Sequence, residues 1–134
     1  MIQAQNYIAG EWHKASKEVA NINPSNTNDV IGEFPQAGAD AAASAIAAAK
    51  AAFPAWSRSS IQLRHDILKR IGDEIIARKD ELGRLLAREE GKTLVEGIGE
   101  TVRAGQIFLF FSGECLRLAG DKLASVRPSV DVEG

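Results

Sequence analysis

The pattern of apolar and polar positions divides the 134-residue chain into regions of different character. Residues 1–36 alternate short β-type runs with turn residues, which predicts two small hairpins. The connection Asn23–Asp29 reads as a turn, because Asn and Asp side chains bond nearby backbone N–H groups and Pro24 presets its φ. Residues 39–120 repeat apolar side chains at helical spacing, and residues 124–133 alternate again as an extended segment.

The first helix is predicted in an alanine-dense run, with Asp40 as its N-cap and Pro54 ending it just after Phe53. Ser59 or Ser60 then caps a longer amphipathic helix. The apolar face of this helix consists of Leu63, Ile67, Leu68, Ile71, Ile75 and Ile76. We expect that face to lie against a core.

The longer helix continues or restarts after a kink or short break at Lys79–Asp80, and Gly91 ends it. The last long helix is predicted from Gly99 to Gly120, and it is apolar on two sides. One stripe contains Ala104, Phe108, Phe111, Cys115 and Leu118, and the other contains Val102, Leu109 and Leu116 with Gly105 and Gly113.

A helix with two apolar sides is normally buried on both. The other predicted elements offer little surface to cover the second stripe of the last helix. Each large side chain left in water forgoes roughly 1.5–3 kcal/mol. The pattern therefore predicts that the chain either self-associates or is one part of a larger protein.

The stretch REEGKTLVEGIGE, residues 88–100, contains Gly-Lys-Thr and so suggests a phosphate-binding loop. That motif requires a glycine where the chain has Leu86, and it should follow a strand, whereas helical spacing precedes it here. A dinucleotide motif beginning at Gly97 fails because Val102 replaces its third glycine. The residues instead predict a helix stop at Gly91 and a short glycine-bearing joint before the next helix.

Charge and composition assign no partner to the chain. Sixteen Lys and Arg are scattered among eighteen Asp and Glu, which predicts no nucleic-acid and no membrane partner. The N-terminal residues resemble no signal peptide, and no run approaches the roughly 18 apolar residues of a membrane span, so we expect a cytoplasmic protein.

The chain offers few groups for chemistry. Cys115 is its single cysteine, and His13 and His65 are far apart, so the sequence predicts neither a disulfide nor a metal site. His65 is expected on the solvated side of its helix. We accordingly predict no catalytic, cofactor-binding or metal-ligating residue in residues 1–134.

Five stretches carry a resemblance that runs nearly from end to end. They are NYIAGEW, INPSNTNDVIGEFP, AIAAAKAAFPAW, RHDILKRIGDEIIARKDELGRLLAREEGKTLVEG and AGQIFLFFSGECLRLAGDKL. Together they resemble the N-terminal quarter of the NAD(P)-dependent aldehyde dehydrogenase superfamily. The sequences of these stretches are most similar to those of bacterial 2-oxoglutarate semialdehyde (2,5-dioxopentanoate) dehydrogenases. Succinate semialdehyde dehydrogenases come second in similarity. In that family the EGK at residues 90–92 marks a helix break.

The resemblance implies a mainly α chain with three to four long helices, N-terminal hairpins and a C-terminal extended segment. Residues 1–134 would form the N-terminal portion of the cofactor-binding domain within an α/β fold. The family's cysteine nucleophile, oxyanion asparagine, general-base glutamate and NAD or NADP motifs would all lie beyond Gly134. Some members bind a monovalent cation near the equivalents of Ile22 and Glu89.

Cys115 lies mid-helix in SGECLRL without the family's nucleophile context. We therefore predict a buried, inert thiol there.

Three functional hypotheses follow from the sequence. The first is an N-terminal part of an aldehyde dehydrogenase acting on a small carboxylated aldehyde, inactive and without cofactor by itself, with the remainder of the polypeptide as its partner. The second is a stand-alone helical module that binds a partner or itself through an exposed apolar helix face. The third is nucleotide binding by residues 88–100.

Overall fold

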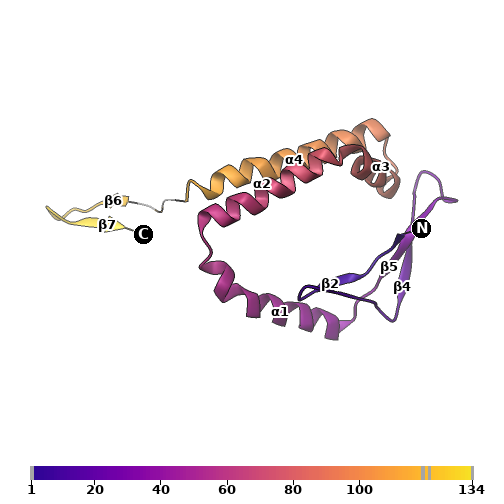
Figure 1. Cartoon of the computed structure of the whole chain (residues 1–134), viewed down its shortest axis with the longest axis horizontal. Coiled ribbons are helices and arrows are strands. Elements are labelled where there is room, and N and C mark those ends of the chain that lie inside the picture. Colours follow the sequence, from indigo (N-terminus) through magenta and orange to yellow (C-terminus); the bar gives the residue numbers. More distant parts are fainter. Residues whose placement is uncertain (1, 119, 121, 134) are drawn as a thin grey trace.

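The computed structural model describes residues 2–118, 120 and 122–133 (Figure 1). Its strands are β1 (Ile2–Gln3), β2 (Asn6–Ile8), β3 (Glu11–His13), β4 (Glu18–Ile22), β5 (Val30–Pro35), β6 (Lys122–Ala124) and β7 (Asp131–Glu133). Its helices are α1 (Ala39–Ser57), α2 (Ile61–Ala77), α3 (Lys79–Glu90) and α4 (Leu94–Cys115). This arrangement confirms the predicted fold class. None of the described helices is long and apolar enough to cross a bilayer.

The N-terminal strands form the two predicted hairpins. Strands β2 and β3 pair antiparallel around a turn at Ala9 and Gly10, both of which have positive φ. Strands β4 and β5 also pair antiparallel, and the N–H of Asn23 donates to the carbonyl of Asp29 across the predicted turn between them. Strand β1 adds to this hairpin in parallel, giving the order β1-β5-β4. Ile31 in the central strand is 1% exposed, the one large side chain among the described residues with less than 2% of its surface exposed.

Helix α1 differs from the prediction at both ends. It begins after the N-cap Gly38, so Asp40 lies in the first turn, where its charge still favours the helix dipole. Pro54 lies inside the helix, which continues to Ser57. A proline removes one backbone donor from a helix. Helix α1 has no buried residue, so water can solvate the carbonyl that Pro54 leaves without a partner.

Helices α2 and α3 begin and end close to the predicted positions. The Ser60 side chain caps α2 by accepting a hydrogen bond from the N–H of Leu63. The predicted break falls at Arg78, between the two helices and one residue before the predicted position. Gly91 ends α3 in the left-handed conformation, with φ of 70°. The helix stop predicted there is confirmed.

Helix α4 begins five residues earlier than predicted, at Leu94. Thr93 and Glu96 form a capping box at its start, so residues 94–100 are its first turns and not a glycine-bearing joint. The connection between α3 and α4 is therefore short, residues 91–93. The helix ends at Cys115, earlier than the predicted Gly120, and Ala119 lies outside the described residues.

Helix α4 packs antiparallel on α2 and α3 through glycines. A Cβ placed on Gly105 would lie 2.6 Å from Ile76 and 3.1 Å from the carbonyl oxygen of Gly72. A Cβ on Gly97 would lie 2.4 Å from the carbonyl oxygen of Gly83. Only residues without a side chain permit backbones to approach this closely. The helices therefore meet along glycines and along part of the second predicted stripe of α4, since a Cβ on Gly72 would lie 2.8 Å from Leu109.

The predicted apolar face of α2 divides in two. Leu68, Ile75 and Ile76 are half-buried, whereas Leu63, Ile67 and Ile71 are exposed. One side of the helix thus packs on α4, and a second apolar stripe remains in solvent.

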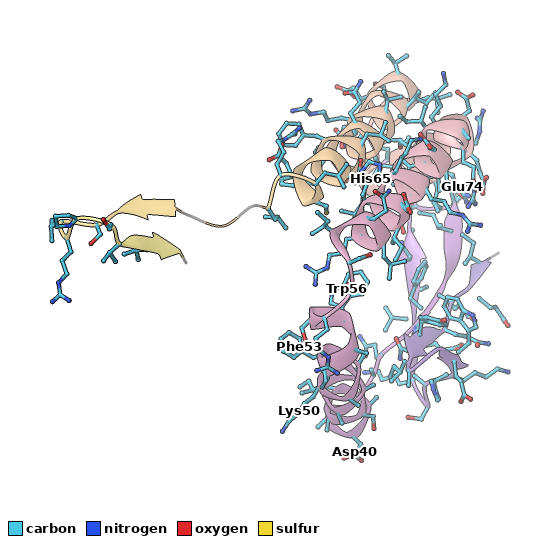
Figure 2. The ribbon with its side chains drawn as sticks, turned by 60° about the vertical axis from the view of Figure 1, so that its left-hand side comes forward. Asp40, Lys50, Phe53, Trp56, His65 and Glu74 are labelled. Carbon is cyan, nitrogen blue, oxygen red and sulfur yellow. The ribbon has the colours of Figure 1, made fainter. Side chains whose placement is uncertain are left out.

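The predicted C-terminal extended segment consists of two strands, β6 and β7, that pair antiparallel with each other. Ser129, with φ of 63°, lies in the connection between them. Both views show this hairpin standing away from the helices (Figures 1 and 2).

Candidate functional site

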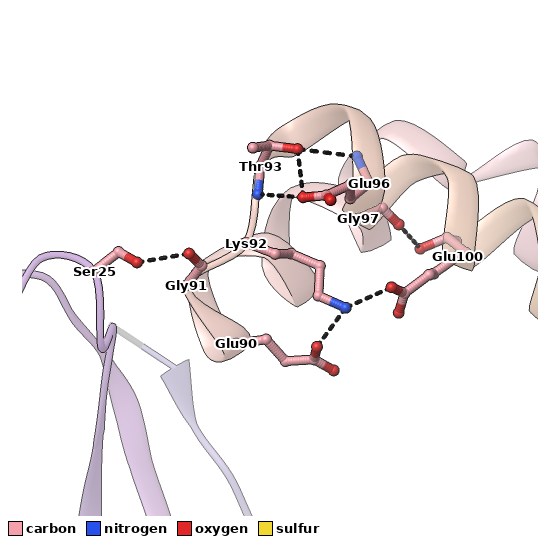
Figure 3. A network of polar contacts seen from close by, with 9 residues as sticks. Ser25, Glu90, Gly91, Lys92, Thr93, Glu96, Gly97 and Glu100 are labelled. Atoms are coloured by element: carbon pink, nitrogen blue, oxygen red, sulfur yellow. Dashed lines mark hydrogen bonds and ion pairs between the residues drawn. The ribbon is translucent and has the colours of Figure 1, made fainter.

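The joint between α3 and α4 is the part of the chain that the sequence singles out for chemistry, and Figure 3 shows its polar contacts. Thr93 Oγ1 accepts from the N–H of Glu96 at 3.4 Å, and the Glu96 carboxylate accepts from the N–H of Thr93 at 3.1 Å. The Thr93 hydroxyl also donates to that carboxylate at 2.7 Å, and this bond, followed by the one from the Thr93 N–H, lowers the pKa of Glu96. The N-terminus of α4 is thus already occupied by a carboxylate of its own chain. A bound phosphate would have to compete with that charge.

Lys92 stands where a phosphate-binding loop has its lysine. Its ammonium group contacts the carboxylates of Glu90 and Glu100, the latter at 2.6 Å (Figure 3). These two partners, Glu100 first, raise the pKa of Lys92. The side chain is only 18% exposed. Because both carboxylates neutralise it within the chain, this geometry favours a structural joint over a phosphate site.

The same joint contacts the turn between β4 and β5. Ser25 Oγ donates to the carbonyl of Gly91 at 2.6 Å, and Asn21 Nδ2 donates to Glu89 at 2.8 Å. Arg88 binds Asp29 through two hydrogen bonds of 2.9 and 2.6 Å.

The guanidinium of Arg88, helped by the Asn23 amide, lowers the pKa of the Asp29 carboxyl from 3.8 to about 2. Asn23, Ser25, Arg88, Gly91 and Lys92 are among the residues that line an open pocket of about 300 Å³ beside these contacts. No sequence signal predicts these pairs, because their residues are 59 to 68 positions apart.

The prediction that His65 lies on a solvated surface is wrong. Its Nδ1 lies 2.8 Å from the carbonyl oxygen of Ser112, and the side chain sits at the contact between α2 and α4 (Figure 2). Since a carbonyl only accepts, Nδ1 carries the proton and donates. His65 precedes Gly72 by seven residues, two helical turns, and so shares its face. That spacing was the signal in the sequence.

The predicted mid-helix, buried position of Cys115 is wrong, because α4 ends at this residue and its side chain is only half-buried. Its assignment as an inert thiol remains a prediction. The described residues contain no group of three or more His, Cys, Asp or Glu side chains arranged to hold a metal ion. The structure places Glu89 against Asn21, next to Ile22.

A large exposed apolar surface is the other notable feature. The chain exposes 10000 Å², whereas a compact monomer of 14.4 kDa exposes about 6,800 Å². Phe110 and Phe111 on α4 are 61% and 54% exposed. Phe53 and Trp56 are exposed on α1, which stands apart from α2 and α4 (Figure 2). About 3,200 Å² of surface is therefore in excess of what a compact chain of this mass shows.

Comparison with protein families gives one match, to the model described as "Aldehyde dehydrogenase family", over residues 12–132. Among curated relatives, the alpha-ketoglutarate semialdehyde dehydrogenase of Haloferax volcanii is 34% identical over 131 residues, which cover 96% of this chain and 27% of that protein.

Solved structures match as well. The succinate-semialdehyde dehydrogenase of Burkholderia pseudomallei superposes with a TM-score of 0.85 at 36% identity, covering 92% of this chain and 26% of that one. The betaine aldehyde dehydrogenase of Staphylococcus aureus, solved with NAD+, gives a TM-score of 0.88 at 30% identity, covering 98% of this chain and 27% of that one. The chain thus spans about a quarter of the length of these proteins.

Proposed function

Because this chain belongs to the aldehyde dehydrogenase family, we propose that it forms the N-terminal portion of the cofactor-binding domain of a cytoplasmic, NAD(P)-dependent dehydrogenase. The proposed reaction is oxidation of a small, carboxylated aldehyde to the acid. The substrate class is supported by relatives named for α-ketoglutarate, glutarate and succinate semialdehydes. NAD or NADP is supported by neighbours solved with NAD+ and with NAP.

Within that enzyme the proposed role of residues 1–134 is structural. The chain alone is proposed to bind no cofactor and to catalyse no oxidation. Its excess exposed surface is the observation that carries this role, because the surface is apolar on α1, α2 and α4 at once. A layer with that many uncovered faces is suited to lie against further polypeptide.

The area of the excess exposed surface favours the remainder of the polypeptide, and not a second copy of this chain, as the partner that covers it. A standard interface buries about 800 Å² on each partner, and the excess here is about four times that. One symmetric contact between two copies would leave most of it in water.

The exposed residues Ile107, Phe110 and Phe111 support a second candidate, a helical interaction module that binds a partner or itself. Arg103 and Gln106 complete a pocket of about 280 Å³ around them. This candidate needs only the outer face of α4 to be covered. It leaves the apolar stripes of α1 and α2 without a role.

Replacement within a full-length relative tests the proposal. The 134 residues are substituted for the matching quarter of an active semialdehyde dehydrogenase, and aldehyde-dependent NADH or NADPH formation is measured with succinate semialdehyde. We expect the chimaera to fold and retain activity and the 134-residue chain alone to show none. Aldehyde-dependent reduction by the isolated chain, verified by intact mass, would contradict the structural role.

A matched control separates the two candidates. A chimaera carrying Phe110→Ser and Phe111→Ser is expected to lose soluble expression, because both rings would lie against the rest of the enzyme. An active chimaera with these substitutions would favour the interaction module, whose face would then be free for another partner.

A further inference from the structure

The three-stranded sheet β1-β5-β4 and the helices α2 to α4 are joined by hydrogen bonds at one place among the described residues. All of these bonds connect residues 21–29, at the turn between β4 and β5, to residues 88–91, at the end of α3. We infer that these two segments form a polar latch that holds the sheet on the helices and can open without unfolding them. The latch consists of Asn21, Ser25 and Asp29 on the sheet side and Arg88, Glu89 and Gly91 on the helix side.

The latch fixes orientation as well as distance. Arg88 donates to Asp29 from two guanidinium nitrogens, Nε and Nη2. Such paired bonds hold two planar groups in one relative orientation. Ser25 binds the backbone of Gly91 from the middle of the turn, and Asn21 binds Glu89 from the end of β4. Contacts at three separate points of one turn restrict its rotation against α3.

Shape complementarity reinforces the polar contacts at Gly91. A Cβ at this position would lie 2.5 Å from Ser25 Oγ and 2.8 Å from Pro24 Cγ. The residue also has φ of 70°, a conformation that side chains rarely adopt. Gly91 therefore serves two purposes, ending α3 and giving the turn room to dock.

Apolar burial in the outer strand β4 contributes little at this junction. Its large apolar residues Val19 and Ile22 are 43% and 45% exposed, whereas Ile31 in the central strand is buried. Helices α2, α3 and α4 instead hold one another through the pairs Gly72–Gly105 and Gly83–Gly97, away from the turn. Loss of a latch contact should therefore release the turn and spare the helices.

Hydrogen exchange measured by mass spectrometry on the 134-residue chain tests the latch. We expect Arg88→Gln to raise exchange of residues 23–29 by about tenfold, since a charged hydrogen-bond pair is lost. Amides of α4 around Gly97 and Gly105 should keep their protection. Arg84→Gln is the matched control, because Arg84 is exposed on the same helix and lines the same pocket but makes no hydrogen bond or ion pair with the turn among the described residues.

Gly91→Ala is expected to raise the exchange of residues 23–29 in the same way, because its side chain would push the turn away from α3. Exchanging the charges, with Asp29→Arg and Arg88→Asp together, should restore at least part of the protection that either change alone removes. The latch is disproved by a turn that exchanges equally in the wild type, Arg88→Gln and Arg84→Gln chains. It is also disproved if Arg88→Gln removes helical protection together with that of the turn, because the two would then be a single cooperative unit.

Discussion

Asp29 shows how one side chain links two distant parts of the chain. Its carboxylate accepts both hydrogen bonds of Arg88 and one from the Asn23 amide, and it therefore stays ionised to unusually low pH. Asn23 supports it from within the turn, and Arg88 reaches it from α3. Local turn geometry and long-range docking thus meet at a single carboxyl group.

The pKa of Asp29 predicts the pH dependence of this contact. A group whose folded pKa is depressed stabilises the fold fully above its ordinary pKa, and the stabilisation is lost as pH falls through the folded value. For Asp29 that window runs from 3.8 down to about 2. Carboxyl-carbon NMR should show Asp29 titrating near the lower value, and in Arg88→Gln near the upper one. An unchanged titration in the variant would contradict the assignment to Arg88.

Two neighbouring glycines in α4 should respond in opposite directions to alanine. Gly97→Ala forces a Cβ toward the carbonyl of Gly83 and should destabilise the chain by about 1–3 kcal/mol. Gly99→Ala is the matched control, since a Cβ there meets nothing within 4 Å. It should stabilise the chain by about 0.5–1 kcal/mol through helix propensity. Urea unfolding followed by circular dichroism measures both, and a shift of the same sign in both variants would refute the close crossing.

At the scale of elements, the start of α4 shows which signals the sequence holds. Ser60, Gly91 and the turn after Asn23 were predictable because their partners lie within a few residues. The capping box at Thr93 is equally local, but the glycines that follow it indicated a joint. They are helical because Gly97 packs against Gly83, a long-range contact with no local signature.

The same limit applies to the polar contacts. Arg88 and Asp29 are separated by 59 residues, and no spacing rule pairs them. His65 was misassigned because its face is set by where α4 crosses α2. Resemblance to a family supplied the overall arrangement, whereas the contacts that hold the site together depend on the packing of whole helices.

The capping box predicts how firmly α4 begins. Thr93→Ala removes the side-chain acceptor for the N–H of Glu96 and should cost about 1 kcal/mol. Thr93→Ser keeps the hydroxyl and should be nearly neutral. Hydrogen exchange of the first turn of α4 and urea unfolding check the pair. Equal stability of the two variants would show that the box contributes nothing.

The whole molecule is distinguished by how much apolar surface it leaves in water. The helices approach one another closely at their glycines, where Ile76 and Leu109 also pack. Phe53 and Trp56 on α1 and Phe110 and Phe111 on α4 remain exposed. A layer packed in this way gains stability when something lies on its outer faces.

Light scattering after size exclusion should detect this exposure in the isolated chain. We expect copies of the chain to associate with one another. In a variant carrying Phe110→Ser and Phe111→Ser the association should weaken, because burial of each ring contributes about 1.5–3 kcal/mol to its free energy. Lys79→Gln, exposed at the start of α3, is the control and should leave the association unchanged. A well-behaved monomer at all concentrations would count against uncovered apolar faces.

The glycine pairs also determine the distance between the helices. At Gly72–Gly105 and Gly83–Gly97 the separation of the helices is set by the close approach of backbone carbonyls, together with a few inward side chains such as Leu109 and Ile76. The outward-facing residues can therefore be exchanged for larger or smaller ones while the thickness of the layer stays constant. A designer could re-engineer what this layer binds without altering the spacing between whatever lies on its two sides.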